Sequence, residues 1–311
     1  MNEFFISKIQ KIQKMLEDLP FDLAGCKKVV QGRRDLSLSL KFVSIEKVRK
    51  LLKGLKSKTS TSIDQLDNYS VKIVADYIAE PLHYVITLSI LQQTFPSSWK
   101  LTKIVPLHKK QSTLKKENYR PVAILSPLSK ILEKLVFNQL YYYFESRSLF
   151  HQSLHGYRRG RSTTTALLSM YEKWVFAASK KKLSGIVMLD LSAAFDLVSP
   201  KLLIKKLKVY GLETCFISWI ESYLSKRFQC VWIDHIYSTL LANETGVPQG
   251  SLLGPLLFLI FFNDLPCYVS QDMDCYADDS NMTSSGTSVV DIGHLMNKDC
   301  DQVRIWTLSN K

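Results

Sequence analysis

The chain has 311 residues, of which 46% are hydrophobic and 22% are charged. This composition supports one large domain or two interlocked ones around a substantial buried core, and it excludes a chain that is disordered throughout. Lysine and arginine outnumber aspartate and glutamate by 41 to 28, which gives a formal net charge of +13. Such an excess is typical either of a soluble protein with a basic face or of a protein that binds a partner with many phosphates, such as a nucleic acid.

Neither a zinc site nor a membrane segment is expected. The six cysteines form no C-x-x-C pair, and His151 and His155 have no cysteine nearby, so reduced buried thiols of an intracellular protein fit better. The N-terminus lacks the apolar run and the cleavage site of a signal peptide. The most apolar stretch, 252–262, is too short to cross a bilayer, which needs about 20 residues.

The first half of the chain alternates helical and extended patterns. Residues 1–43 are weakly patterned and are expected to form a helical extension. Ser44 caps a helix whose apolar side chains recur on one face. Residues 71–95 also have a helical pattern, which we expect to break or restart at Pro81. Further elements are predicted as strands at 104–107 and 122–125, a long helix from Ser126-Pro127 to Tyr143, and a helix capped by Ser162.

The second half adds a strand that ends on an acidic residue and a hairpin-like pair of strands. The apolar run 185–189 predicts a buried strand that leads directly into Asp190. Strands at 273–276 and 281–283 flank a tight turn. Helices are predicted at 200–211, 216–224, from about 251 and at 289–308, with a β-hairpin at 228–241. Strands separated by helices, together with hairpins, indicate a mixed α+β architecture.

Two acidic positions suggest chemistry. Asp190 follows the buried strand, and Asp278 and Asp279 occupy the tight turn. Adjacent carboxylates repel each other unless a divalent cation neutralises them, and Mg²⁺ favours carboxylates combined with water and phosphate oxygens. Two such ions can activate a hydroxyl and stabilise a leaving group. The alternatives are a solvated turn for the Asp-Asp pair and a helix cap for Asp190.

Five segments of the chain resemble, in order and spacing, motifs of the reverse transcriptases of non-LTR (LINE-type) retrotransposons. The jockey and chicken-repeat groups are the most similar. The segments are 118–122 (Asn-Tyr-Arg-Pro-Val), 155–158 (His-Gly-Tyr-Arg), 190–196 (Asp-Leu-Ser-Ala-Ala-Phe-Asp), 246–250 (Gly-Val-Pro-Gln-Gly) and 276–279 (Tyr-Ala-Asp-Asp).

The resemblance implies an RNA-directed DNA polymerase with right-hand fingers and a ferredoxin-like palm. The fingers would comprise 44–182 with part of 199–245, and the palm would comprise 183–311 and stop before the thumb. Asp190, Asp278 and Asp279 would hold two Mg²⁺ ions, with Mn²⁺ as an alternative. The implied partners are an RNA template, a DNA primer and deoxynucleoside triphosphates, with other retroelement domains or proteins in a nuclear or cytoplasmic ribonucleoprotein.

The resemblance also assigns roles around the incoming nucleotide. Arg120 would hold the triphosphate with help from Lys109 or Lys110, because an arginine can bind two phosphate oxygens at once. Phe195 would exclude the 2′-hydroxyl of ribonucleotides, although a core aromatic side chain would explain it equally well. Gln249 and Gly250 would line the nucleotide pocket. For the lysines, a solvated loop remains the alternative.

Template contacts and departures from the family pattern complete the expectations. Arg158 and Arg161 would bind the template backbone, unless they are ordinary surface charges. The segment 61–65 lacks the glycines that usually flank its Ile-Asp pair, and 110–112 lacks a Gly-Asp tip. The missing thumb and upstream endonuclease predict a fragment or a decayed copy. The competing functions are an inactive nucleic-acid-binding remnant and an RNA-directed RNA polymerase.

Overall fold

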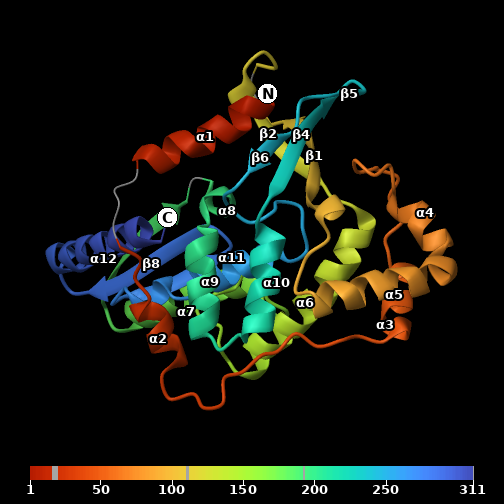
Figure 1. The fold of residues 1–311 in the computed structure, drawn as a ribbon. Coiled ribbons are helices and arrows are strands. Elements are labelled where there is room, and N and C mark those ends of the chain that lie inside the picture. Colours follow the sequence, from red (N-terminus) through yellow and green to blue (C-terminus); the bar gives the residue numbers. More distant parts are fainter. Residues whose placement is uncertain (16–19, 110–111, 192, 311) are drawn as a thin grey trace.

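The computed structural model describes residues 1–15, 20–109, 112–191 and 193–310. Two separate β-sheets are surrounded and joined by helices, as Figure 1 shows. The predicted mixed architecture of strands and helices is therefore confirmed. The way in which segments far apart in the sequence combine in these sheets determines where the candidate residues lie.

Helices dominate the region before the first strand. The first 43 residues contain α1 (Asn2–Met15) and α2 (Ala24–Val30). The Ser44 hydroxyl accepts a hydrogen bond from the Lys47 N–H at the start of α3 (Ile45–Lys53), so the predicted cap is confirmed. Next come α4 (Asn68–Ile73) and α5 (Ala75–Leu91).

The expected break at Pro81 is wrong, because α5 continues through it. The interruption lies at Val74, which separates α4 from α5 with φ −89° and ψ 12°. Pro81 and Tyr77 both lie on the exposed side of α5, where Pro81 leaves the Tyr77 carbonyl without its usual N–H partner. A hydrated carbonyl reduces the cost of a proline inside a helix.

The larger sheet has the order β2-β1-β4-β5, and β6 pairs with β4. Its strands are β1 (Leu101–His108), β2 (Tyr119–Ile124), β4 (Arg227–Ile233), β5 (Ile236–Tyr237) and β6 (Leu241–Asn243). β1 is antiparallel to β2 but parallel to β4, a strand from much later in the chain. The short 3-10 helices η1 (Ser97–Lys100) and η2 (Lys116–Asn118) precede β1 and β2.

The smaller sheet has the order β3-β8-β7 and is antiparallel throughout. It consists of β3 (Leu183–Asp190), β7 (Asp272–Tyr276) and β8 (Asp279–Gly286). α12 (Val289–Ser309) packs on one face, where a Cβ on Gly185 would lie 2.6 Å from the Ile292 side chain. α7 (Thr163–Ser179) contacts all three strands, and its Ser169 and Lys173 reach Asp274 on the opposite face.

The remaining helices build the core between the two sheets. They are α6 (Pro127–Ser146), α8 (Ala194–Leu197), α9 (Pro200–Val209), α10 (Thr214–Leu224), α11 (Gly254–Phe262) and η3 (Leu265–Cys267). α11 is buried along most of its length. Beside it, the fully buried Lys206 ammonium donates to the Asp264 carboxylate at 2.6 Å and to the Phe261 carbonyl at 2.7 Å.

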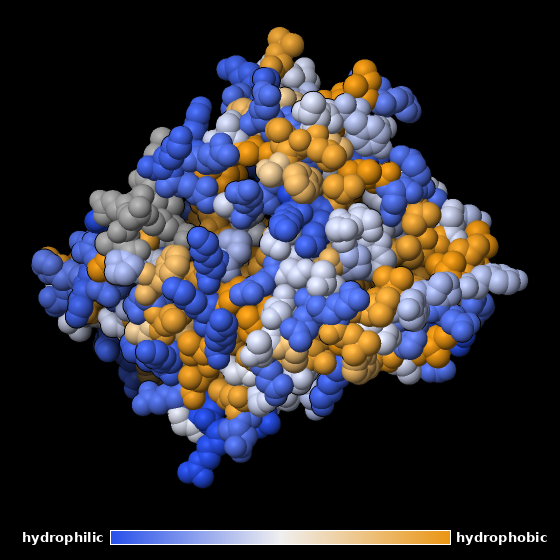
Figure 2. Space-filling view, in the orientation of Figure 1, coloured by the Kyte–Doolittle hydropathy of each residue, from blue (hydrophilic) through white to orange (hydrophobic). Residues whose placement is uncertain are grey.

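In the view of Figure 2, apolar side chains gather over α4 and α5, among other places on this face. Ile73, Val74, Val85 and Leu91 are exposed there. Within the described ranges, no helix has the length and apolar character needed to cross a membrane.

Candidate active site

The smaller sheet brings two of the three acidic candidates together. Asp190, the last residue of β3, pairs in antiparallel register with Asp279, the first residue of β8. Directly opposite residues on neighbouring strands point to the same face of a sheet, with Cβ atoms about 5 Å apart. Both side chains are exposed at this end of the sheet. The fold therefore places side by side two carboxylates that are far apart in the sequence.

The third acidic candidate lies in the turn next to this pair. Tyr276 pairs with Asp279, so only Ala277 and Asp278 form the connection between β7 and β8. Ala277 has φ +59°, the left-handed conformation that two-residue hairpins need at their first turn position. The tight turn predicted between two strands is therefore present, and it fixes the backbone of Asp278 beside that of Asp279.

These carboxylates fit a divalent cation by their chemistry. In the described part of the chain, none of the three forms an ion pair with a lysine, arginine or histidine. Hard cations such as Mg²⁺ prefer such oxygen ligands. Among the described residues, however, no three His, Cys, Asp or Glu side chains gather closely enough to hold a metal ion by themselves. The backbone brings the acidic positions together, but the side chains do not yet converge.

Phe195 lies on α8, which follows the acidic end of β3 after a left-handed residue, Ala193, with φ +57°. Its ring stacks on Phe258 of α11, with centroids 4.4 Å apart and an interplanar angle of 15°. The edge of a second aromatic ring, that of Tyr157, meets it at 6.0 Å and 84°. Phe195 is half-buried, so one side is held by the core while the other remains accessible.

The segment 246–250 packs directly on α8. Gly246 has φ +76°, and a Cβ there would lie 2.7 Å from the Phe195 carbonyl oxygen, so only glycine permits this approach. The Val247 N–H donates to that same carbonyl at 2.9 Å. Gln249 donates from Nε2 to the Asp196 carboxylate at 2.6 Å. Burial raises the pKa of Asp196, and the Gln249 hydrogen bond and the charge of Lys8 partly offset this effect.

Gly250 joins this segment to the larger sheet. With φ +73°, it approaches β2 so closely that a Cβ would lie 2.6 Å from the Ala123 carbonyl oxygen. The buried Glu133 of α6 supports the same turn, since its carboxylate accepts hydrogen bonds from the Leu252 and Leu253 N–H groups, at 2.8 and 3.4 Å. These donors lie at the start of α11, whose N-cap residue makes no side-chain cap. Glu133 thus caps the start of α11 together with the Ser251 hydroxyl, which accepts from the Gly254 N–H at 2.8 Å.

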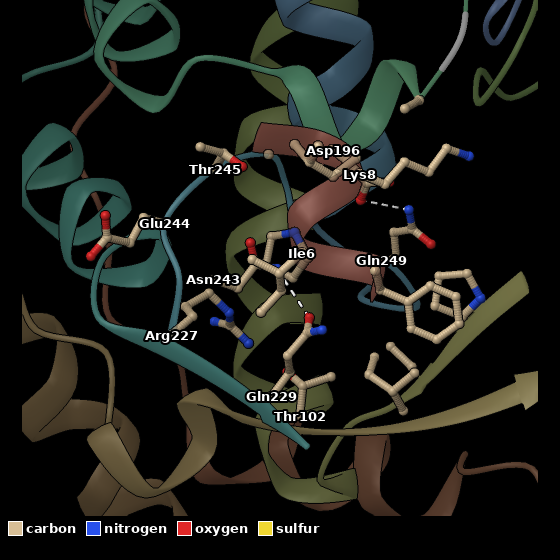
Figure 3. A pocket seen from close by; sticks show the side chains of 18 of the residues that line it. Ile6, Lys8, Thr102, Asp196, Arg227, Gln229, Asn243, Glu244, Thr245 and Gln249 are labelled. Carbon is tan, nitrogen blue, oxygen red and sulfur yellow. Dashed lines mark hydrogen bonds between the residues drawn. The ribbon is translucent and has the colours of Figure 1, made fainter. Parts of the chain in front are cut away.

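A cavity of about 480 Å³ opens beside Gln249, as Figure 3 shows. Asp196 and Gln249 line one side, Ala123 lies on the β2 side, and α1 forms an outer wall with Ile6 and Lys8. The volume is within the usual range for small-molecule sites. None of the three acidic candidates is among the residues that line this cavity.

α1 is anchored at its beginning by polar contacts with the larger sheet. The buried Asn2 side chain donates to the Gln229 and Thr239 carbonyls and accepts from the Gln229 side chain at 3.0 Å. Phe5 packs in a small cluster with Ile104 and Val231. No feature of the sequence reasoning connected residues 1–15 with the site. The pairing of α1 with the larger sheet depends on strands formed much later in the chain.

The basic candidates lie on the exposed parts of the larger sheet and the following loops. Arg120 on β2 is exposed and stands in register with Leu107 of β1. Lys109 is also exposed, and its backbone N–H donates to the Asn118 carbonyl at 2.8 Å. Lys110, the other predicted triphosphate contact, lies outside the described residues. Arg161 is exposed at the start of α7.

Arg158 has a different environment from these exposed cations. Its guanidinium pairs with Glu145 through Nε to Oε1 at 3.0 Å and Nη2 to Oε2 at 2.9 Å. It also donates to the His151 and Leu154 carbonyls. These four bonds organise the 151–158 loop and leave little donor capacity free, since a guanidinium has five N–H groups. Its expected template contact stays a prediction.

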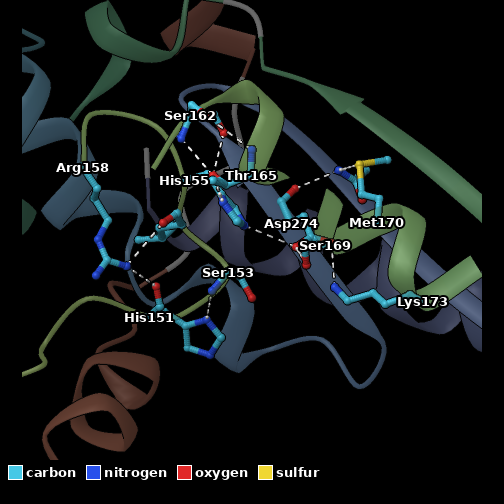
Figure 4. A network of polar contacts seen from close by, with 12 residues as sticks. His151, Ser153, His155, Arg158, Ser162, Thr165, Ser169, Met170, Lys173 and Asp274 are labelled. Atoms are coloured by element: carbon cyan, nitrogen blue, oxygen red, sulfur yellow. Dashed lines mark hydrogen bonds and ion pairs between the residues drawn. The ribbon is translucent and has the colours of Figure 1, made fainter. Parts of the chain in front are cut away.

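A polar network under the acidic turn was not foreseen (Figure 4). Asp274 on β7 is buried, and its carboxylate accepts from the Ser169 hydroxyl at 2.7 Å and from the Lys173 ammonium at 2.6 Å. The buried His155 ring lies 3.5 Å from the same carboxylate and 3.0 Å from the Thr165 hydroxyl. In the sequence, Asp274 looks like one more polar residue in a short strand, and only the fold reveals its partners.

Comparison with known proteins adds an independent line of support. The sequence profile of the family described as "Reverse transcriptase (RNA-dependent DNA polymerase)" matches residues 107–308. That span includes each acidic candidate, the segment 246–250 and the 151–158 loop.

Three curated proteins of Drosophila melanogaster are among the relatives. A probable RNA-directed DNA polymerase from transposon BS is 32% identical over 239 residues, or 75% of this chain and 26% of the relative. The RNA-directed DNA polymerase from mobile element jockey is 28% identical over 265 residues, or 82% and 29%. A probable RNA-directed DNA polymerase from transposon X-element is 27% identical over 277 residues, or 85% and 30%. The chain thus spans less than a third of each of these relatives, and it belongs to the reverse transcriptase family, with non-LTR retrotransposon enzymes among its relatives.

Proposed function

We propose that this chain provides the fingers and palm of an RNA-directed DNA polymerase that extends a DNA primer along an RNA template. The observation that carries the proposal is the register of the smaller sheet, which pairs Asp190 with Asp279 and sets Asp278 in the adjoining two-residue turn. The family match and the names of the relatives support the same chemistry.

The proposed metal ligands are Asp190, Asp278 and Asp279, with two Mg²⁺ ions, or Mn²⁺ in their place, as the cofactor. When bound, the ions would lower the pKa of the primer 3′-hydroxyl and stabilise the charge on the leaving pyrophosphate. The chain itself contributes the rigid placement of the carboxylates: β3 and β8 set the distance between two of them, and the left-handed Ala277 sets the third. The side chains would have to turn toward one another as the cations bind.

Residues of the larger sheet and of the 246–250 turn are proposed to hold the incoming deoxynucleotide. Arg120, with Lys109 and Lys110, would bind the triphosphate by charge-assisted hydrogen bonds. Gln249 and Gly250 would border the nucleotide. The cavity beside Gln249 lies between α8 and the face of β2 that carries Tyr119, Pro121 and Ala123, which supports the role of Gln249. Arg120 alternates to the exposed face of β2, so its role rests on the family resemblance. Catalysis would then rest on positioning and electrostatic stabilisation.

Phe195 is proposed to contact the sugar and to exclude the 2′-hydroxyl. A residue that excludes the 2′-hydroxyl must be both accessible and rigid. The Phe195 ring meets both requirements, because it is half-exposed and Phe258 supports one of its faces. Template contact is proposed for Arg161 and Arg158, with Arg161 the better placed of the two because of its exposure.

The proposed division of the chain follows the two sheets. The helical extension at 1–43 precedes fingers formed by 44–182 with part of 199–245, and 183–311 forms a palm. The pairing of β4 with β1 supports this assignment, because it draws residues of 227–233 into the same sheet as 101–108.

Replacing one carboxylate tests the proposal. Asp278→Asn should reduce Mg²⁺-dependent primer extension on an RNA template by about 10³-fold or more, while RNA binding persists, because the change removes a charge without changing the shape. Asp301→Asn, an exposed aspartate on α12, is the matched control and should retain activity. Extension at the wild-type rate by Asp278→Asn would show that the assignment is wrong.

The same assay separates the alternatives. A wild-type chain that binds RNA but extends no primer would be the inactive remnant, and preferential incorporation of ribonucleotides would indicate an RNA polymerase. Phe195→Ala should admit ribonucleotides if Phe195 contacts the sugar, and an unchanged sugar preference would exclude that role.

A further inference from the structure

The segment 153–157, which we call the brace, joins the edge of the smaller sheet through a single β-bridge. The Cys275 N–H donates to the Ser153 carbonyl, and the His155 N–H donates to the Cys275 carbonyl, both at 2.8 Å. Leu154 forms a parallel bridge with Cys275. Since β7 is the edge strand, the brace covers backbone groups that would otherwise be unpaired, directly before the acidic turn.

The brace ends in contact with the backbone of the acidic turn itself. A Cβ on Gly156 would lie 2.3 Å from the Ala277 nitrogen and 3.1 Å from its Cα, so no side chain fits there. The next residue, Tyr157, has φ +58°, which is unfavourable for a bulky side chain. Tyr157, Ala193 and Ala277 are three left-handed non-glycine residues gathered at one site. Such conformations persist where the surroundings hold them, and they cluster at functional sites.

Strong contacts hold the backbone on both sides of Tyr157. Before it, the buried His155 ring connects to Asp274 on β7 and to Thr165 on α7, as Figure 4 shows. After it, Arg158 forms its paired hydrogen bonds with Glu145 on α6. The position of Tyr157 is therefore fixed relative to three elements and to the turn that carries Asp278.

The Tyr157 ring contacts one residue of the proposed mechanism directly. Its edge-to-face contact with Phe195 has a centroid distance of 6.0 Å and an angle of 84°. Burial raises the pKa of the Tyr157 phenol, and the nearby charge of Asp278 raises it further. The side chain thus contacts the ring proposed to contact the sugar, and its backbone follows directly on the contact of Gly156 with the turn that carries Asp278.

We infer that Tyr157 is a specificity-determining residue that positions Phe195 against the sugar of the incoming nucleotide. Phe258 supports one face of Phe195, but stacking alone leaves the ring free to slide and tilt. The edge contact with Tyr157 restricts the tilt. Because Gly156 fixes Tyr157 on the turn, the sugar gate and the carboxylates share one rigid support. This inference rests on the proposed function.

Packing alone accounts poorly for Tyr157. A tyrosine that only fills the core is mostly buried and adopts a relaxed backbone, whereas Tyr157 is 45% exposed and left-handed. Burial of the side chain therefore does not explain the strained backbone of Tyr157. Its place next to Phe195 and the acidic turn does.

The test is the sugar selectivity of Tyr157 variants of the full chain. The measured quantity is the ratio of kcat/KM for a deoxynucleotide to kcat/KM for the matching ribonucleotide, on an RNA template with a DNA primer and Mg²⁺. Tyr157→Leu should lower this ratio by about 3- to 10-fold, the value of one aromatic edge contact. Tyr157→Phe keeps the ring and should keep the ratio. Tyr171→Leu, on the exposed surface of α7, is the matched control.

A double variant tests whether Tyr157 acts through Phe195. In the Phe195→Ala background, Tyr157→Leu should change the ratio by less than about 2-fold, because the positioned ring is gone. If Tyr157→Leu does not fold, Tyr157→Met is measured instead.

Three results would overturn the inference. Equal losses for both nucleotides, with the ratio unchanged, would show a purely structural role. An equal loss of selectivity in Tyr157→Phe would assign the effect to the hydroxyl. A wild-type chain that extends no primer would end the proposed function and this inference together, whereas the first two results leave the proposed function intact.

Discussion

Gly156→Ala should disturb the acidic turn without adding charge or changing polarity. The added Cβ would stand 2.3 Å from the Ala277 nitrogen, and ordinary contact begins at 3.4 Å. The atoms nearest to this Cβ all belong to the backbone, so no flexible side chain can move aside. Gly156 itself does not have a left-handed φ, and the effect is therefore purely steric. Either the brace or the turn at Ala277 and Asp278 must move by about 1 Å.

A displacement of this size has a predictable effect on the rate. Misplacing a catalytic group by about 1 Å costs on the order of 10²-fold, so kcat for primer extension should fall by about that factor. Single-turnover extension on an RNA template measures it, with the melting temperature recorded for each variant.

Gly293→Ala is the matched control, because a Cβ there meets no atom within 4 Å and its helix gains a better helix former. This control should extend primers at the wild-type rate. A folded Gly156→Ala variant with wild-type kcat would refute the reasoning, since it would mean that the position of the turn does not matter for the reaction.

Three further predictions concern stability. Lys206→Met should destabilise the fold by about 3–5 kcal/mol in chemical denaturation, because it leaves the Asp264 carboxylate buried without its cation; a smaller loss than Asp264→Asn gives would contradict this. Burial raises the pKa of Glu133, so the folded state retains a proton that the unfolded state releases, and stability should fall as pH rises above about 4.5. Glu133→Gln should remove this slope from a plot of Tm against pH, and an unchanged slope would count against it. Burial raises the pKa of Glu145, but the hydrogen bonds from Arg158 outweigh this effect, so the pKa is lowered overall. The ionised Glu145 should therefore stabilise the fold above about pH 4.5, and this contribution should be lost as the pH falls below that value. Glu145→Gln and wild type should then converge in Tm at low pH.

Local signals in the sequence were sufficient for most helix starts. Ser126, Ser162 and Ser199 each accept a hydrogen bond from the first turn of the helix that follows, as their positions before an apolar pattern predict. The strand that ends on Asp190 and the turn at Asp278 were also predictable, because apolar runs and turn residues act over a few positions.

Pairings between distant segments were not predictable in this way. The parallel alignment of β1 with β4 depends on the helices between them, and no residue of either strand specifies it. The role of Asp274 was equally hidden, since its partners lie on α7 and in the brace. The expectation at Pro81 failed because a propensity rule takes no account of whether the affected carbonyl reaches water.

The order in which the strands of both sheets are made has a consequence for synthesis on the ribosome. β1 and β2 emerge early, but their neighbour β4 is made only after α6, α7, α9 and α10, and β3 likewise waits for β7 and β8. Until then each early strand exposes an edge that another chain can join. Contacts between distant segments also form slowly. A nascent chain that stalls before residue 279 would hold Asp190 on an unpaired strand, so the acidic site and resistance to aggregation arise together once β8 has been made.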